Sequence, residues 1–132
     1  MSFRQKLTKY LDNHAETREN HQDSSLQTRY YKTTKDKGLK MLENYFRNSP
    51  DYKLNAVSSE RGEISVITNK GRKAFIVVTV IMVRPFFTAI DFSVTTETVL
   101  PIDFGFSTKV IHQLYDQVNK ELIQIDDIRM GS

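Results

Sequence analysis

Two histidines near the start of the chain are the first residues whose types could do chemistry. His14 and His21 are accompanied by Glu16, Glu19 and Asp23, and imidazole and carboxylate groups are common metal ligands. The spacing of the histidines fits neither an i, i+4 pair on a helix nor a zinc finger. Because the surrounding segment is polar and has no sustained period, we expect a solvated arm and no metal site.

A second set of polar residues follows one side of a predicted strand. Asp91, Ser93, Thr95 and Glu97 alternate with apolar residues, so they share one face. Asp91 and Glu97 then lie about 20 Å apart at 3.3 Å per residue, whereas paired catalytic carboxylates of glycosidases lie within about 10 Å. We interpret the row as a solvated strand face. An enzyme using Asp91 or Glu97 with Arg84 or a histidine is an alternative.

The remaining motifs for catalysis have simpler structural explanations. Asp103-Phe104-Gly105 matches the magnesium-binding tripeptide of protein kinases, but the chain lacks a glycine-rich loop and a catalytic-loop motif. We expect the tripeptide to form the turn into the last helix. The chain has no cysteine, which excludes disulfides, thiolate nucleophiles and cysteine-based zinc sites. The sequence therefore predicts no catalytic residue, no cofactor and no metal.

Basic and aromatic residues interleave in Arg29-Tyr30-Tyr31-Lys32, and three basic residues crowd the turn over 70–73. Single-stranded nucleic acid is bound by stacking aromatics beside a basic groove. Acidic residues are scattered through the same regions, and no recognised RNA-binding motif is present. We keep nucleic-acid binding as a weak alternative. Its candidate basic patch consists of Arg29, Lys32, Lys70, Arg72 and Lys73.

The most informative stretch is the apolar run over residues 74–83, which is apolar on both faces if it is a strand. The next strand alternates, so one of its faces is a core face and the other is polar. A partner should therefore cover the second face of the apolar strand. The candidates for that partner are the chain's own N-terminal segment, a second subunit or an apolar ligand. The predicted interface or ligand-facing residues are Phe75, Val77, Ile81, Val83 and Phe87.

Periodicity and turn signals predict the elements that position these residues. An amphipathic helix over residues 2–12 and a polar arm over residues 13–28 come first. The chain continues with a short strand from Arg29, a helix over 35–48 capped by Thr33 or Thr34, and four strands. A last helix, with Ser107 as its N-cap, runs to about Ile123. This order predicts an α+β two-layer sandwich, with a four-stranded antiparallel meander flanked in sequence by two helices. The predicted units are residues 1–28, 29–125 and a frayed tail over 126–132.

Composition sets the broad class of protein. The chain has 132 residues, 39% of them hydrophobic and 27% charged, which is typical of one soluble globular domain. The formal net charge of +3 is compatible with an acidic partner without requiring one. The apolar run is too short for a membrane-spanning helix, and the first residues do not form a secretory signal. Together with the lack of cysteine, these features predict a cytoplasmic protein.

Several stretches carry a resemblance: FRQKLTKYLDNHAETRENHQDSSLQTRYYKTT, GEISV, RPF.TAIDFSVTTET and PIDFGFS, where the dot stands for any residue. With these, the chain resembles a family of small soluble cytosolic proteins of Gram-positive bacilli to which no activity is assigned. The resemblance implies a bacterial, cytoplasmic origin and no site residue. From the residues, we expect a non-enzymatic interaction or adaptor module, as a homodimer or with a protein partner. A carrier of a small apolar ligand is the alternative.

Overall fold

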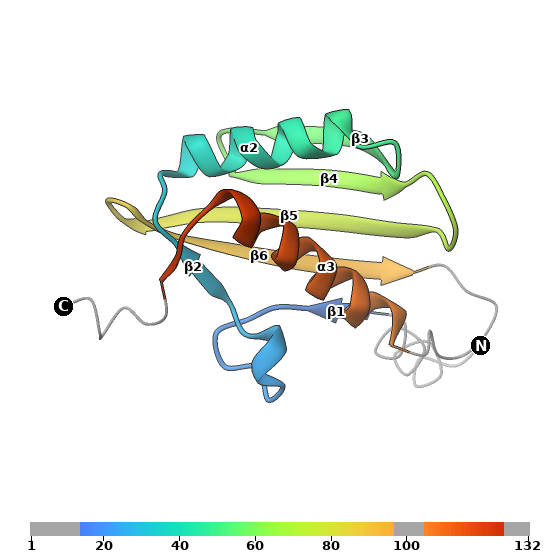
Figure 1. Cartoon of the computed structure of the whole chain (residues 1–132), viewed down its shortest axis with the longest axis horizontal. Helices are drawn as coiled ribbons and strands as arrows, with labels where there is room; N and C mark the ends of the chain where they lie inside the picture. The colour runs from blue at the N-terminus through green and yellow to red at the C-terminus, as the bar shows by residue number, and fades with distance from the viewer. Residues whose placement is uncertain (1–13, 97–104, 126–132) are drawn as a thin grey trace.

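The computed structural model describes residues 14–96 and 105–125, which form an α+β fold with a seven-stranded antiparallel sheet and two α-helices (Figure 1). The predicted helix over residues 2–12, the tail over 126–132, Glu97 and Asp103 lie outside the described residues. The elements are, in order, β1 His14–Glu16, the 3-10 turn η1 Ser24–Leu26, β2 Arg29–Tyr31, α2 Lys35–Asn48, β3 Tyr52–Ser58, β4 Glu63–Thr68, β5 Ala74–Arg84, β6 Phe87–Thr96, α3 Phe106–Glu121 and β7 Gln124–Ile125.

The sheet has the strand order β3-β4-β5-β6-β2-β7, and β1 also pairs with β6. Strand β5 pairs with β6 along almost its whole length, from Ala74 opposite Thr96 to Arg84 opposite Phe87. The other edge of β6 is shared by two short strands. One end pairs with β2 and the other end pairs with β1.

Residues 14–28 begin with a strand of the sheet and continue into a partly buried 3-10 turn, although the sequence predicts a polar arm there. Strand β1 pairs with β6, and the backbone N–H of Thr17 donates to the carbonyl of Phe92 at 2.9 Å. The chain then leaves the sheet and returns, with Leu26 of η1 buried in the core. Each ordered piece is only three residues long, which is too short to show a period in the sequence.

The core lies between one face of the sheet and the two helices. Helix α2 contacts β3, β4 and β5, while α3 contacts β6 and β1, and both lie in front of the sheet in Figure 1. On this side Ala74, Ile76, Val78 and Val80 of β5 are buried, as the apolar pattern predicts, whereas Met82 and Arg84 near the end of the strand are exposed. Strand β6 buries Thr88, Ile90, Phe92 and Val94, as the alternation predicts. The helices contribute Leu39, Leu42, Phe46, Val110, Ile111, Leu114, Tyr115 and Val118.

The helix boundaries follow from local chemistry. Thr34 caps α2, as expected, because its hydroxyl accepts a hydrogen bond from the N–H of Lys37 at 3.2 Å. Helix α3 begins at Phe106, and its N-cap is Gly105, with a left-handed φ of 79°, two residues before the predicted cap Ser107. Ser107 is buried inside the first turn and does not cap the helix. Among the described residues, no helix is long and apolar enough to cross a membrane.

The turn between β3 and β4 is held against β5 through a glycine. Gly62 has a φ of 70°, and its carbonyl accepts a hydrogen bond from the N–H of Val80 at 2.7 Å. A Cβ at this position would collide with the carbonyl oxygen of Val80, which belongs to the backbone of a central strand. Only glycine satisfies both the left-handed conformation and the close approach.

We expect Gly62→Ala to destabilise the fold more than Gly71→Ala. Gly71 also has a positive φ, of 68°, but a Cβ there would meet nothing within 4 Å. Its replacement should cost only the strain of the left-handed conformation, about 1–2 kcal/mol. The collision at Gly62 should add a further cost of about 1–3 kcal/mol. Urea unfolding of both variants measures the difference, and equal losses would contradict the role of the Gly62 contact.

Candidate functional site

The face of the sheet that points away from α2 and α3 is called the open face here. Residues that lie directly opposite each other in an antiparallel pair share a face, so the register defines its members. Its central rows consist of Ile67, Phe75 and Thr95; Ser65, Val77 and Ser93; Glu63, Thr79 and Asp91; and Ile81 with Ala89. Because both described helices lie in front of the sheet, this face points away from the viewer in Figure 1.

Large apolar side chains on the open face are exposed to solvent. Phe75 is 45% exposed and Ile81 is 52% exposed, while Val83 near the end of β5 is 48% exposed and Val77 is half-buried. Phe86 in the turn after β5 is also exposed, and it is a non-glycine residue with a φ of 58°. The sequence predicted these residues as an interface because of their pattern. Among the described residues, no helix covers Phe75 and Ile81, although their pattern predicts that a partner covers them.

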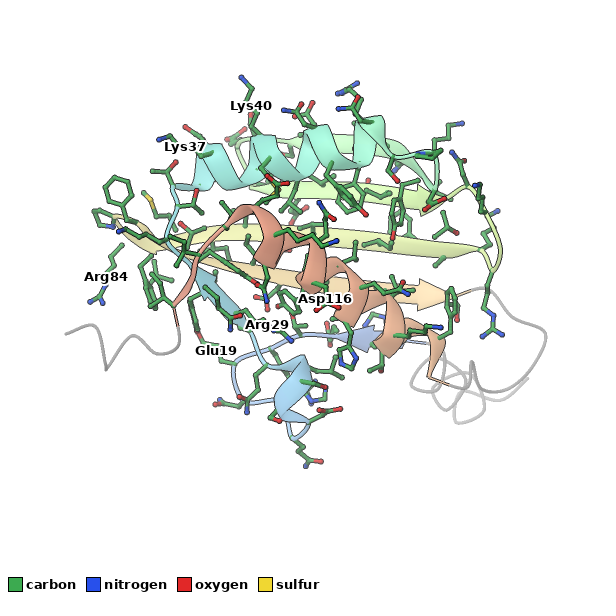
Figure 2. The ribbon with its side chains drawn as sticks, viewed as in Figure 1. Glu19, Arg29, Lys37, Lys40, Arg84 and Asp116 are labelled. Carbon is green, nitrogen blue, oxygen red and sulfur yellow. The ribbon has the colours of Figure 1, made fainter. Side chains whose placement is uncertain are left out.

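The fifth predicted interface residue has a different place. Phe87 is buried, and its ring stacks on that of Tyr30 at a centroid distance of 4.8 Å. The guanidinium of Arg84 lies over the Phe87 ring, 5.0 Å from its centroid. Figure 2 shows Arg84 at the end of the β5–β6 hairpin. The Tyr30 hydroxyl donates to Glu19 at 2.7 Å. Phe87 therefore anchors β2 to β6 and does not face a shared cavity with Phe75.

A carboxylate lies in the middle of the open face. The Oδ1 atom of Asp91 accepts hydrogen bonds from the hydroxyl of Thr17 at 2.5 Å and from that of Thr28 at 2.7 Å. The Thr17 hydroxyl also accepts a hydrogen bond from the N–H of Phe92 at 3.0 Å. The interpretation of this strand face as simply solvated is therefore wrong at Asp91, which joins the two ends of the segment between β1 and β2.

Burial raises the pKa of the Asp91 carboxyl, and the nearby carboxylates of Glu19 and Glu16 add to the increase. The hydrogen bonds from Thr17 and Thr28 stabilise the charged form and lower the pKa, but they do not overcome desolvation. Glu16 lies beside His14, with 3.8 Å between its Oε2 and the Nε2 of the histidine. The Nδ1 of His14 is 2.6 Å from the hydroxyl oxygen of Thr95.

Three hollows are distributed over the open face. One of about 230 Å³ is lined by Glu16, Thr79, Asp91 and Ser93 among others. A second of about 410 Å³ lies beside Phe75, Ile67 and Thr95, and a third of about 550 Å³ lies between β3, β4 and β5. Apolar walls next to a single half-buried carboxylate are suited to contact with a partner and to proton binding. They do not form a pair of nucleophile and base.

The histidines and acids singled out near the N-terminus have separate structural roles. Asp23 caps η1 by accepting hydrogen bonds from the backbone N–H and the hydroxyl of Ser25 at 2.9 and 2.6 Å. The Nδ1 of His21 accepts from the N–H of Asp23 at 3.0 Å. His112 of α3 also serves this segment, with its Nε2 2.9 Å from the hydroxyl oxygen of Ser25. Within residues 14–96 and 105–125, no three metal-ligating side chains converge.

The structure divides the predicted basic patch between two ends of the sheet. Arg29 lies opposite Ile90, whereas the turn with Lys70, Arg72 and Lys73 precedes Ala74, which lies opposite Thr96. Six positions along β6 separate these places by about 20 Å. The guanidinium of Arg29 lies over Tyr115 and that of Arg72 over Phe106, at 4.3 and 4.9 Å from the ring centroids. Lys70 pairs with Asp51 at 3.6 Å, and Lys32 is exposed on the loop after β2.

Comparison with known proteins adds no assignment. No family model matches the chain, and no curated protein matches it. The resemblance to a family of cytosolic proteins of bacilli therefore stays a prediction. The functional residues that sequence analysis missed are Thr17 and Thr28, whose partner Asp91 lies 74 and 63 positions away. Nothing local in the sequence indicates these contacts.

Asp91→Asn should change stability in a pH-dependent way. Because the pKa of Asp91 is raised above its ordinary value of 3.8, the folded protein binds this proton more tightly than the unfolded chain. The charged form therefore costs stability at neutral pH, and this cost disappears as the pH falls through the raised pKa.

We expect the amide variant, which keeps an oxygen for Thr17 and Thr28, to be more stable than the wild type at pH 7. The advantage should shrink as the pH falls toward 4. Urea unfolding at both pH values measures it, with Asp116→Asn on the exposed side of α3 as the control. The opposite result, in which the stability of the variant relative to wild type is lower at pH 7 than at pH 4, would contradict this expectation. It would show that the hydrogen bonds to the charged carboxylate outweigh its desolvation.

Proposed function

We propose that this chain is a non-enzymatic interaction module that buries the open face of its sheet against a protein partner. The simplest such partner is a second copy of the chain. The observation that carries the proposal is the exposure of Phe75 and Ile81 on one face of β5 that no described helix covers. Large apolar side chains that are exposed on one face of a sheet are a common feature of interaction sites in soluble proteins.

The size of the open face supports this proposal. The strands of the open face differ in length, from 11 residues in β5 and ten in β6 to three each in β1 and β2. At 3.3 Å per residue and 4.8 Å between strands, the six strands from β1 to β6 together cover about 630 Å². A stable protein–protein interface buries about 800 Å² on each partner. The open face therefore supplies most of the area of an interface.

The contacts of Asp91 also favour interaction over catalysis. Its carboxylate accepts two threonine hydrogen bonds that fix residues 17 and 28, so its visible task is structural. Its place among Val77, Thr79 and Ser93 leaves a shallow hollow with mixed lining, as at the centre of an interface.

Three expectations from the sequence belong to the same proposal. The protein acts in the cytoplasm, it belongs to the family of bacillar cytosolic proteins that it resembles, and residues 2–12 form an amphipathic helix. The amphipathic pattern of Phe3, Leu7, Tyr10 and Leu11 supports the helix. These residues lie outside the part that the structure describes.

Ile81→Asp should abolish self-association and leave the fold intact. The sequence pattern alone predicts severe destabilisation, but Ile81 is half-exposed in the single chain, so a charge there stays hydrated. In an interface the same carboxylate would be buried without a partner. We expect the dimer dissociation constant to rise at least about 30-fold, as for a central hot-spot residue. Sedimentation velocity measures it, and circular dichroism checks the fold.

Gln113→Asp on the exposed side of α3 is the matched control, because it introduces the same charge on the opposite side of the molecule. It should associate like the wild type. A wild type that stays monomeric at every concentration tested would contradict the homodimer. If the Ile81 and Gln113 variants associate equally, the interface does not lie on the open face.

A small apolar ligand is the second candidate occupant, favoured by the hollow of about 410 Å³ beside Phe75. Native mass spectrometry of the protein purified from cells should then show a retained mass that Phe75→Asp removes. Detection of the bare polypeptide alone would contradict a carrier function.

A further inference from the structure

We infer that the N-terminal segment of the chain itself, residues 1–13, covers the centre of the open face when no partner is bound, and that a partner must displace it. The cover goes beyond the proposed function, because it names the occupant of the face in the single chain. Only the displacement by a partner rests on that function. Three features of the segment fit the open face: its attachment point, its apolar stripe and its charges.

The N-terminal segment joins the sheet beside the exposed ring of Phe75. His14, the first described residue, begins β1 and lies opposite Thr95 near the end of β6 (Figure 1). Thr95 in turn lies opposite Phe75 on β5, so two strand spacings, or about 10 Å, separate His14 from Phe75. Leu11 lies three positions before His14, and an extended chain spans about 10 Å in three residues. The hollow of about 410 Å³ lies at this point, beside Phe75 and Thr95.

The apolar stripe of the segment matches the exposed row of β5 in length. A helix over residues 2–12 is about 16 Å long, and Phe75 and Ile81 on β5 lie about 20 Å apart. A helix is about 10 Å across, so it would cover β5 and the facing edges of both neighbouring strands. An isolated helix of this length is marginal in water, so the stripe needs a surface to pack against. Its apolar residues share an arc of about 100° and are Phe3, Leu7, Tyr10 and Leu11.

The charges of the open face are acidic at its middle and basic at one end. The middle row carries Glu63 on β4 and Asp91 on β6, one on each side of β5. Lys53 of β3 and Lys73 before β5 lie at the end that holds Phe75. A second copy of the chain would bring another acidic row to this face, and like charges repel. A cationic segment with an acidic residue at its attached end is attracted instead.

The N-terminal segment carries its charges in this order. Asp12 lies next to the attachment point and therefore at the basic end of the face. Lys6 and Arg4 lie about 9 and 12 Å further along a helix, and the acidic row lies about 13 Å from the row of Phe75. The two cations flank the apolar stripe on opposite sides, each about 70–90° from its centre. One can thus approach the carboxylate on β4 while the other approaches the carboxylate on β6.

The docked segment competes with a partner for the same apolar row. A partner binds only the fraction of chains in which the row is open, and its apparent dissociation constant is the intrinsic constant divided by that fraction. A substitution in the segment that weakens docking and leaves the open face unchanged therefore strengthens binding of the partner.

A single tryptophan reports whether the segment is docked. The chain contains no tryptophan, so Phe3→Trp introduces a unique fluorophore into the apolar stripe. We expect blue-shifted emission and slow quenching by acrylamide, both independent of protein concentration. Ile81→Asp in the same chain should expose the fluorophore, because it puts a carboxylate beneath the stripe. Gln113→Asp, on the exposed side of α3, should leave it protected.

Two results would overturn the cover. One is a solvent-exposed tryptophan, or a tryptophan that responds equally to Ile81→Asp and Gln113→Asp. The other is protection that disappears on dilution, which would place the segment of another copy on the face.

Charge reversal within the segment tests the docked geometry without any change to the sheet. Lys6→Glu reverses a cation that flanks the apolar stripe, whereas Lys9→Glu makes the same change on the side of the helix away from the stripe. In the Phe3→Trp chain, Lys6→Glu should lower the docking equilibrium constant about 2- to 5-fold, as for loss of a surface ion pair, and should increase quenching. Lys9→Glu should behave like the parent chain. Equal effects of the two reversals would overturn the orientation.

Sedimentation velocity of the same charge variants separates the cover from the proposed function. If a second copy binds the open face, Lys6→Glu should dimerise more tightly than wild type and Lys9→Glu should not. A tryptophan protected through Ile81 in a chain that stays monomeric as wild type and as Lys6→Glu supports the cover and overturns the homodimer. An exposed tryptophan in a chain that dimerises through Ile81 overturns the cover and leaves the proposed function standing.

Discussion

The tandem pairing of β1 and β2 along one edge of β6 is the constraint on which the rest of the structure depends. Two strands of three residues fill this edge, so the chain between them must leave the sheet and return beside Asp91 and Phe92. Thr17 marks the departure and Thr28 the return, and their hydroxyls meet on one oxygen of Asp91. The carboxylate therefore compensates for the interruption of the strand edge, which explains why a charged residue is half-buried there.

The open face carries both exposed apolar side chains and the carboxylate of Asp91. Both described helices cover the other face, so the odd-numbered apolar residues of β5 have no internal partner among the described residues. The residue that closes the sheet edge belongs to the same row as Thr79, between Phe75 and Ile81. The carboxylate that holds Thr17 and Thr28 thus lies among the exposed apolar side chains of the open face. Burial there raises the pKa of its carboxyl group.

Sequence analysis predicted the parts of the fold that depend on long periodic segments. Helix α2, with its Thr34 cap and its stripe of Leu39, Leu42 and Phe46, is one example, and the alternation of β6 is another. Strands β1, β2 and β7 have three, three and two residues, which carry almost no periodic signal. The role of Asp91 was missed for a related reason, since a strand pattern distinguishes two faces but cannot identify partners more than 60 positions away.

The exposed apolar residues are informative because of their arrangement. Single apolar side chains on a protein surface are common and need no explanation. Phe75, Val77 and Ile81 lie on one side of one strand, in the interior of a seven-stranded sheet. Phe87 shows the contrast, because the same chain buries an aromatic ring on β6 with Tyr30 where a neighbouring strand is available. Phe75 and Ile81 have no such covering ring among the described residues, and the hydrophobic effect disfavours the exposed apolar surface that results.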